Sequence, residues 1–429
     1  MSLGLWALVG VFVTLAVLRV PIALAMFSAG MAYLWASGQD IGLVVDQTMN
    51  TLQGLSILLA VPMFILAANV MNAATISERL WAAAEALVGR FRGGLAHVTV
   101  LVSVVFSGMS GSAVTDAAGP GMLALRMMRD VSKYPAGFSA AIIAASATIA
   151  PIIPPSIPMI LYALLSGASI GALFLAGVVP GLLMAGSLML AVVIVARARG
   201  LPKGEALPLP AVLLALRRAL LPMTLPAVLL GGLFSGVFTP TEAAAVAALY
   251  ALLLGFAVYR NLGLVVLFAV FLESARQTAV VLMLIASAFL VNYAITVEQV
   301  AQGVAAFVAS AELGPTAFLL GVAVLLLILG LFLDASVILL VFIPLLLPAA
   351  RAVGVDLVHF GIVALLNLMI GLITPPYGLL LFVMAALGRL PLIEIVREIW
   401  IFVIPLVAVV LVLILFPAIT LFLPRLAGW

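Results

Sequence analysis

The chain has 429 residues, of which 67% are apolar and 8% charged, against about 45–50% and about 25% in soluble domains. With 18 Lys and Arg and 15 Asp and Glu, the composition excludes a soluble globular protein, a disordered chain, a coiled coil and a nucleic-acid-binding polycation. There is no cysteine and there are only two histidines, which excludes disulfides, thiolate metal sites and a histidine-rich metal centre. We therefore expect an all-α polytopic membrane protein, because the apolar runs are long and unbroken rather than alternating as in a barrel.

The first predicted helix covers 3–18. No basic residue precedes this run, and Arg19 follows it, which is the reverse of a cleaved signal peptide, so we expect the helix to be retained. Eleven further apolar runs follow, bounded by charges or turn residues. In chain order the predicted spans are 3–18, 21–37, 52–73, 94–125, 135–166, 172–196, 220–238, 241–259, 264–295, 315–350, 358–387 and 399–423.

A basic segment, 197–218, separates the first six spans from the last six. It carries five Lys and Arg against one acid, Glu205, and three prolines. The positive-inside rule places such a segment in the cytoplasm. We interpret it as a linker between two domains, 1–196 and 219–429, and we expect both chain termini in the periplasm.

Two of the runs are predicted to enter the membrane and return as re-entrant hairpins. The first, about 94–130, contains the Gly/Ser cluster Ser107–Ser112 and has basic residues on both flanks, so both of its ends are expected in the cytoplasm. The second, about 315–350, is interrupted by Asp334-Ala-Ser336, and its flanks carry three acids against one base. These flanks favour the outside.

The two halves share a ladder of prolines, which indicates an internal repeat. Two Pro-Pro breaks fall in register, in broken helices predicted at about 135–166 and 358–387. Each half then has five crossings, one of them broken, and one hairpin, and the odd number of crossings inverts the second half relative to the first. Inverted repeats with broken helices are typical of secondary transporters. The paired prolines, 219 to 225 residues apart, are Pro21 with Pro240, Pro120 with Pro344, Pro154 with Pro375 and Pro180 with Pro405.

The hairpin tips and the breaks are predicted to bind two sodium ions. Proline frees a backbone carbonyl, serine adds a hydroxyl, and neither can be left unpaired in lipid. Clusters of such oxygens suit a hard cation, while helix N-termini after the breaks offer positive dipole ends to an anionic substrate. The first sodium site comprises Ser107, Ser110, Gly111, Ser112, Asp116, Pro151 and Pro154; the second comprises Gly330, Asp334, Ser336, Asn367, Thr374 and Pro375; the substrate residues are Ser156, Tyr377 and Gly378.

Several polar residues keep a second interpretation. A charge near the bilayer centre costs about 2.5–3.5 kcal/mol on insertion scales, which favours function for Asp334 and Asp116, but Asp116 could also cap a half-helix. Asn367 is either an oxygen ligand or an interhelical hydrogen-bonding residue. The pair Glu273 and Arg276 is interpreted as an ion pair or interface anchor rather than a substrate site.

The chain resembles the large membrane subunit of TRAP (tripartite ATP-independent periplasmic) transporters over nearly its whole length. The resemblance rests on 107–121, the Pro-Pro breaks, Phe238-Thr-Pro-Thr-Glu-Ala243 and Ile373-Thr-Pro-Pro-Tyr-Gly378. It implies sodium-coupled uptake of a small organic acid across the bacterial inner membrane by an elevator mechanism. It also implies two partners, a small membrane subunit and a periplasmic substrate-binding protein. The substrate itself is left open.

Two other functions compete with transport. Gly108-Met-Ser-Gly111 matches the G-x-S-G of rhomboid-type intramembrane serine proteases, but such an enzyme needs a histidine base beside the serine, and His97 and His359 are expected far from the tip. A channel is the non-enzyme alternative, because paired half-helices also form aquaporin-like pores. Those pores are shorter and carry Asn at the half-helix starts, whereas the tips here carry Ser and Asp.

Overall fold

The structure is a computed structural model that describes residues 2–54, 56–74, 76–204 and 206–429, and within these ranges its regular structure is helical apart from one isolated bridge between Arg92 and Lys203. The helices of the first half are α1 (Leu3–Val17), α2 (Ile22–Ala36), α3 (Leu43–Gly54), η1 (Ser56–Leu59), α4 (Ala60–Ala73), α5 (Ile76–Val88), α6 (Gly94–Ser110), α7 (Ala113–Ala118), α8 (Pro120–Arg126), η2 (Met127–Val131), α9 (Ala136–Ala147), α10 (Ile157–Ser166) and α11 (Ile170–Ala198). Those of the second half are α12 (Leu209–Phe234), α13 (Pro240–Leu253), η3 (Leu254–Val258), α14 (Leu264–Val297), α15 (Val300–Ser310), α16 (Pro315–Gly330), α17 (Ala335–Val337), η4 (Ile338–Phe342), α18 (Ile343–Ala352), α19 (Leu357–Gly371), α20 (Leu379–Gly388), α21 (Leu392–Leu415) and α22 (Pro417–Leu426).

These helices confirm the prediction of an all-α membrane protein. Six helical stretches in the described ranges are long and apolar enough to cross a bilayer: α11, α12, α13 with η3, α14, α17 with η4 and α18, and α21. The shorter apolar helices have 10–17 residues, or about 15–26 Å at 1.5 Å per residue, which is less than the roughly 30 Å of a bilayer core. The ten crossings and two re-entrant hairpins expected from the sequence stay predictions.

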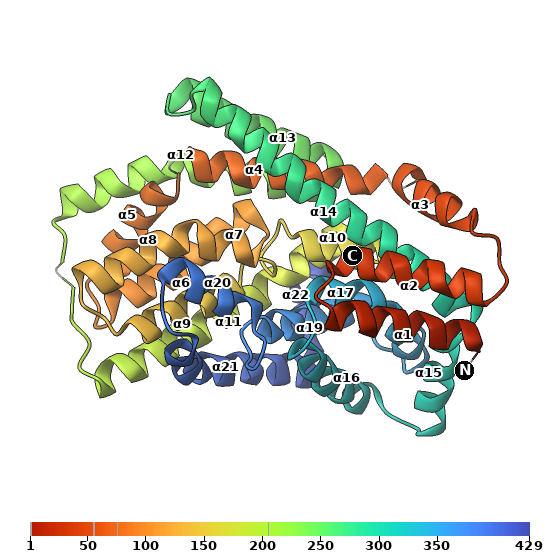
Figure 1. Ribbon diagram of the computed structural model, residues 1–429. Coiled ribbons are helices and arrows are strands. Elements are labelled where there is room, and N and C mark those ends of the chain that lie inside the picture. The colour runs from red at the N-terminus through yellow and green to blue at the C-terminus, as the bar shows by residue number, and fades with distance from the viewer. Residues whose placement is uncertain (1, 55, 75, 205) are drawn as a thin grey trace.

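The helices pack in two groups (Figure 1). The first, which we call the scaffold group, contains α1, α2, α4, α12, α13 and α14; α4 packs on α13 and α14, and α14 also packs on α2. The second, which we call the central group, contains the helices around the two predicted hairpins and breaks, with α9 against α21, α16 against α19 and α11 against α6. The groups meet where α4 contacts α6 and α14 contacts η4.

The chain reverses direction between α6 and α7. Gly111 adopts a left-handed backbone with φ of +58°, which glycine tolerates without steric cost, and the Ser112 hydroxyl accepts a hydrogen bond from the Thr115 amide to begin α7. The arms then lie against each other, since the Ser103 hydroxyl donates to the Asp116 carboxylate at 2.6 Å. The segment has the shape of a hairpin, whose orientation in the membrane stays a prediction.

Both predicted Pro-Pro breaks interrupt a helix. The first separates α9 from α10 over 148–156, and the second separates α19 from α20 over 372–378. Each break contains a cis peptide bond, between Pro154 and Pro155 and between Pro375 and Pro376. The second break is held close to α16, because a Cβ on Gly330 would lie only 2.9 Å from the Gly371 Cα.

Some boundaries differ from the sequence prediction. Helix α11 continues to Ala198 and α12 begins at Leu209, so both helices extend into the predicted linker 197–218. Helices α5 and α15 were not predicted, because each is shorter than a crossing. Helix α13 begins with a capping box, in which Thr239 and Glu242 each accept the other's backbone N–H.

Candidate functional site

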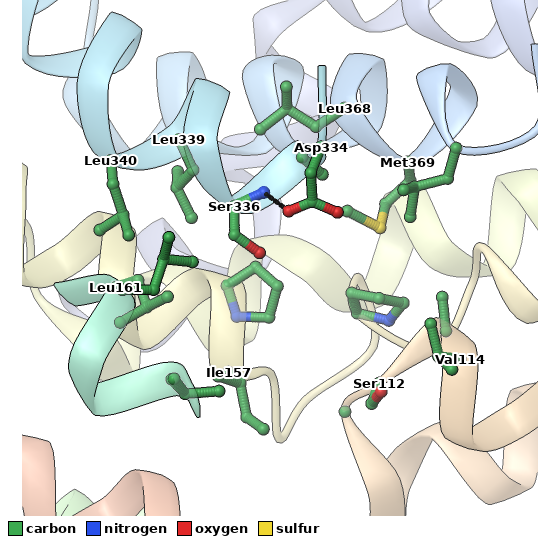
Figure 2. A pocket seen from close by; sticks show the side chains of 18 of the residues that line it. Ser112, Val114, Ile157, Leu161, Asp334, Ser336, Leu339, Leu340, Leu368 and Met369 are labelled. Carbon is green, nitrogen blue, oxygen red and sulfur yellow. Dashed lines mark hydrogen bonds between the residues drawn. The ribbon is translucent and has the colours of Figure 1, made fainter. Parts of the chain in front are cut away.

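The two predicted hairpin tips converge on one cavity of about 190 Å³, which we call the central cavity (Figure 2). Asp334 and Ser336 lie on one side of it, and Ser112 and Val114 lie on the opposite side. Pro151 of the first break and Leu372 of the second also contribute, so all four interrupted segments reach this space. The remaining lining residues are Gly111, Ala113, Ile157, Pro158, Leu161, Val281, Leu284, Ile285, Ala335, Leu339, Leu340, Leu368, Met369 and Leu379.

Asp334 is placed by the interruption between α16 and α17. One of its carboxylate oxygens, Oδ1, accepts a hydrogen bond from the Ser336 amide at 2.8 Å and caps α17. Figure 2 shows this hydrogen bond as a dashed line, and it shows the Asp334 carboxylate pointing into the cavity. Its half-buried side chain therefore offers a negatively charged oxygen to a cation in an otherwise mostly apolar space.

The first tip is pressed onto the first break. A Cβ on Gly111 would lie 2.4 Å from the Pro155 carbonyl oxygen, so no side chain fits there and the two backbones come together. One residue earlier, the Ser110 hydroxyl is buried and has no hydrogen-bond partner among the described residues. A buried hydroxyl without a partner is costly, and a bound cation would satisfy it.

A second cavity of about 390 Å³ lies beside the first, between the scaffold group and the first tip, and we call it the lateral cavity. Ser112, Val114, Ile157 and Val281 line both cavities, which makes them neighbours. Its other lining residues are Ile65, Ala68, Asn69, Ser110, Thr115, Glu273, Arg276, Gln277 and Val280.

A chain of hydrogen bonds fixes the polar wall of the lateral cavity. The Asn69 amide nitrogen of α4 donates to the Gln277 side-chain oxygen at 3.1 Å, and the Gln277 nitrogen donates to the Glu273 carboxylate at 3.0 Å. Glu273 is thus held by Gln277. Of the two roles predicted for Glu273 and Arg276, the ion pair is wrong for the described chain, and the interface anchor stays a prediction. Arg276 makes no ion pair or hydrogen bond within the described parts of the chain, and it is the one cation among the described residues that line these two cavities.

The predicted residues of the first sodium site are spread over several environments. Gly111, Ser112 and Pro151 line the central cavity, and Ser110 lines the lateral one. Ser107 is buried in α6 and donates to the Val104 carbonyl at 2.6 Å. Asp116 is buried with one oxygen on Ser103 and the other, Oδ1, without a partner among the described residues. Pro154 lies in the break behind the tip, where a Cβ on Gly108 would be 3.9 Å from its carbonyl oxygen.

The second predicted set is divided in the same way. Asp334 and Ser336 line the central cavity, whereas Gly330 packs on Gly371. Thr374 donates to the Ile370 carbonyl at 2.7 Å, and Pro375 forms the cis bond of the break. Asn367 is fully buried; its nitrogen donates to the Val363 carbonyl and its oxygen has no described partner.

None of the three predicted substrate residues lines either cavity. Ser156 is fully buried. Its hydroxyl donates to the Pro151 carbonyl and accepts from the Met159 amide, and so caps α10. Tyr377 is 44% exposed and packs its ring 5.9 Å from that of Phe382. Gly378 has a φ of +46° and begins α20. Sequence reasoning instead missed Asn69 of α4 and Arg276 and Gln277 of α14 as cavity residues, although the cluster of polar residues at 273–278 within the long apolar α14 was a visible signal.

The site has no serine–histidine pair of the kind a rhomboid protease needs. The Ser110 hydroxyl is without a described partner, and both ring nitrogens of His359 are buried and equally unpartnered. His97 lies on α6 more than three turns before Ser110.

Comparison with known proteins gives consistent matches over most of the chain. The family model described as the DctM component of the tripartite ATP-independent periplasmic transporter matches residues 9–419. The chain is 40% identical to the sialic acid TRAP transporter large permease protein SiaM of Vibrio cholerae, over 95% of each chain. It is 41% identical to the C4-dicarboxylate TRAP transporter large permease protein DctM of Pseudomonas aeruginosa, over 86% of this chain and 87% of that one. Among solved structures, the YdaH transporter of Alcanivorax borkumensis has a similar fold, with a TM-score of 0.60, 14% identity and 87% of each chain covered.

Proposed function

Because the chain belongs to the family of the DctM component of tripartite ATP-independent periplasmic transporters, we propose that it carries a small organic acid across the bacterial inner membrane, driven by sodium. The family consists of transporters and not of enzymes. The observation that carries the proposal is the convergence of Asp334, Ser336 and Ser112 on one cavity between two hairpin-like tips. Two relatives are named for sialic acid and C4-dicarboxylates, both of which are carboxylates.

The proposed partners follow from the family. A periplasmic substrate-binding protein delivers the acid, and a small membrane subunit packs on the permease. The chain is a multi-pass membrane protein, and we propose that both of its termini face the periplasm. The outer surface of the scaffold group is apolar, with Val265 at 84% and Phe268 at 71% exposure. The bilayer and a small subunit could both contact it.

Two sodium ions are proposed to bind where oxygens gather at the tips. At the first tip the unpartnered Ser110 hydroxyl and the carbonyls of the first break are available. At the second tip the ligands are Asp334, Ser336 and the oxygens near Thr374, with the unpartnered oxygen of buried Asn367 behind them. Carboxylate, hydroxyl and carbonyl oxygens suit a hard cation.

The substrate is proposed to bind across the central and lateral cavities, with its carboxylate on Arg276. This guanidinium has no competing partner in the described chain, because Glu273 is bound to Gln277. A guanidinium can hold a carboxylate through two parallel hydrogen bonds. The hydroxyls of Ser112 and Thr115 on the facing tip complete a polar surface suited to an organic acid.

The contacts support the internal repeat. Helix α6 packs on α9 as α16 packs on α19, and α4 packs on α13 as α14 packs on α2. Two arginines add a further pair: Arg129 donates to the Gly388 carbonyl at 3.0 Å, and Arg351 donates to the Ser166 carbonyl at 2.9 Å. Each arginine lies at or directly after the end of the hairpin of one half and binds the last turn of the broken helix of the other half. These hydrogen bonds join the two halves, which supports movement of the central group as one rigid body in an elevator mechanism.

Sodium-driven uptake in proteoliposomes tests the function. With substrate-loaded binding protein outside, an inward sodium gradient is expected to accumulate a radiolabelled carboxylate, because each net charge carried inward gains about 2.3 kcal/mol per 100 mV. Replacing sodium by potassium should stop accumulation. Equal solute flux without any sodium gradient would identify a channel instead.

Cysteine labelling tests the topology and the elevator together. In single variants Arg92→Cys and Lys133→Cys, an impermeant maleimide is expected to react only from the cytoplasmic side, because both ends of the first hairpin lie there. In Val114→Cys, at the wall shared by both cavities, labelling should switch sides with sodium and substrate. Labelling of the first two from opposite faces contradicts the hairpin, and one-sided labelling of Val114→Cys under all conditions contradicts the elevator.

A further inference from the structure

Two basic segments that are far apart in the sequence lie side by side away from the transport cavities. The turn between α5 and α6 carries Arg90 and Arg92, and the connection after α11 carries Lys203. The Gly93 amide donates to the Pro202 carbonyl at 3.1 Å, and a Cβ on Gly204 would lie 2.1 Å from the Gly89 carbonyl oxygen. The connection is therefore packed directly onto the turn.

These segments form an open groove with a basic end and an apolar wall, which we call the basic groove. Arg92 and Arg197 line its larger part, a space of about 560 Å³, and Arg90 and Lys203 line the adjoining part. The apolar wall consists of Val88, Phe91, Met189, Leu190 and Val193, and His97 completes the lining of this part. Leu190 is 61% exposed, so the wall is open to whatever surrounds the protein.

The charge of the groove is not balanced by the described protein. None of its four cations makes an ion pair with a described residue, and no described acid lines either part. Arg199, two residues beyond Arg197, is by contrast paired with Glu398 at 2.7 Å. The basic flanks place this end of the helices at the cytoplasmic surface, where the leaflet carries anionic lipid.

We propose that the basic groove binds an anionic phospholipid, with the phosphate on Arg92 and Arg197 and an acyl chain along Met189, Leu190 and Val193. A guanidinium pair matches a phosphate through several charge-assisted hydrogen bonds. The apolar wall begins directly beside the cations, which is the arrangement of a lipid with its headgroup at the interface. A soluble anion would use the cations but leave the apolar wall uncovered.

Lipid retention by the purified full-length permease, with any subunit that co-purifies, tests this proposal. Native mass spectrometry and thermal unfolding in a neutral detergent are measured with dioleoyl phosphatidylglycerol, dioleoyl phosphatidylcholine or inorganic phosphate. Phosphatidylglycerol is expected to stay bound and raise the unfolding temperature, and the other two are not. The double variant Arg92→Gln, Arg197→Gln should weaken phosphatidylglycerol binding about tenfold or more.

Matched variants separate a site from general surface charge. The double variant Arg389→Gln, Arg397→Gln removes two exposed arginines that line neither part of the groove, and it should bind as the wild type does. Leu190→Asn keeps every charge and should still reduce retention of the lipid. Undiminished binding in the Arg92 and Arg197 variant, equal loss in the control pair, or equal binding of phosphatidylcholine would overturn the proposal.

Two further outcomes would assign the groove to something else. Stabilisation by inorganic phosphate equal to that by phosphatidylglycerol would make it an anion site. Binding of lipid only after a co-purifying subunit is removed would make it a protein interface. Because none of these measurements uses uptake, they are independent of the sodium and substrate proposals.

Discussion

Replacing Arg276 by glutamine is expected to lower the rate of uptake by about tenfold to a hundredfold. Losing a charge-assisted hydrogen bond costs about 1.5–3 kcal/mol, and the guanidinium is the one described cation at the two cavities. The concentration of loaded binding protein that gives half-maximal uptake should stay unchanged, since Arg276 acts after delivery. Radiolabelled uptake in proteoliposomes, over a range of binding-protein concentrations, measures both quantities.

Two control variants test whether the geometry and the position of the Arg276 charge matter. Arg276→Lys keeps the charge but loses the two-pronged geometry, so an intermediate rate is expected. Arg389→Gln removes an exposed arginine that lines neither cavity and should leave uptake unchanged. A wild-type rate in Arg276→Gln, with normal amounts of protein in the vesicles, would show that the carboxylate binds elsewhere.

Replacing Asp334 by asparagine is expected to raise the sodium concentration for half-maximal uptake by about tenfold. The change removes the negative charge that faces the central cavity, and hydrogen bonds to charged groups contribute about 1.5–3 kcal/mol. Asparagine caps a helix as well as aspartate does, so α17 should still begin at the same place. The sodium dependence of uptake at saturating loaded binding protein provides the measurement.

Two serines provide a companion and a control for Asp334. Ser110→Ala removes the buried hydroxyl that has no described partner and should also raise the sodium requirement. Ser139→Ala removes a buried hydroxyl that is bonded to the Pro135 carbonyl outside both cavities, and it should change nothing. If Asp334→Asn and Ser110→Ala both keep the wild-type sodium dependence, these oxygens are structural.

The sequence predicted the interrupted segments well, because each interruption has a local chemical cause. The paired prolines at both breaks and Gly111, with its positive φ at the reversal of the chain, favour non-helical backbone at these points. Asp334 could be placed at a tip because it is a charged residue that interrupts a long apolar run. Interruptions of this kind can be predicted from residue types alone, without knowing which residues are neighbours in space.

The lateral cavity could not be predicted in this way. Asn69 and Gln277 lie on different helices, and only folding brings them within 3.1 Å of each other. The spacing of Glu273 and Arg276 is equally compatible with an ion pair, and the choice between partners depends on Gln277 one turn further on. Gly330 was assigned to a ligand set because it precedes a tip, yet its lack of a side chain serves the contact with Gly371.

The hydrogen bonds that Arg129 and Arg351 make to the opposite half of the chain limit the order in which contacts can form during synthesis. Ser166 ends α10 in the first half, but the guanidinium that binds its carbonyl belongs to Arg351, 185 residues later in the chain. During synthesis, which proceeds from the N-terminus, the last turn of α10 is made well before the arginine that binds its carbonyl. The first half therefore makes this contact only after the second half has been synthesised.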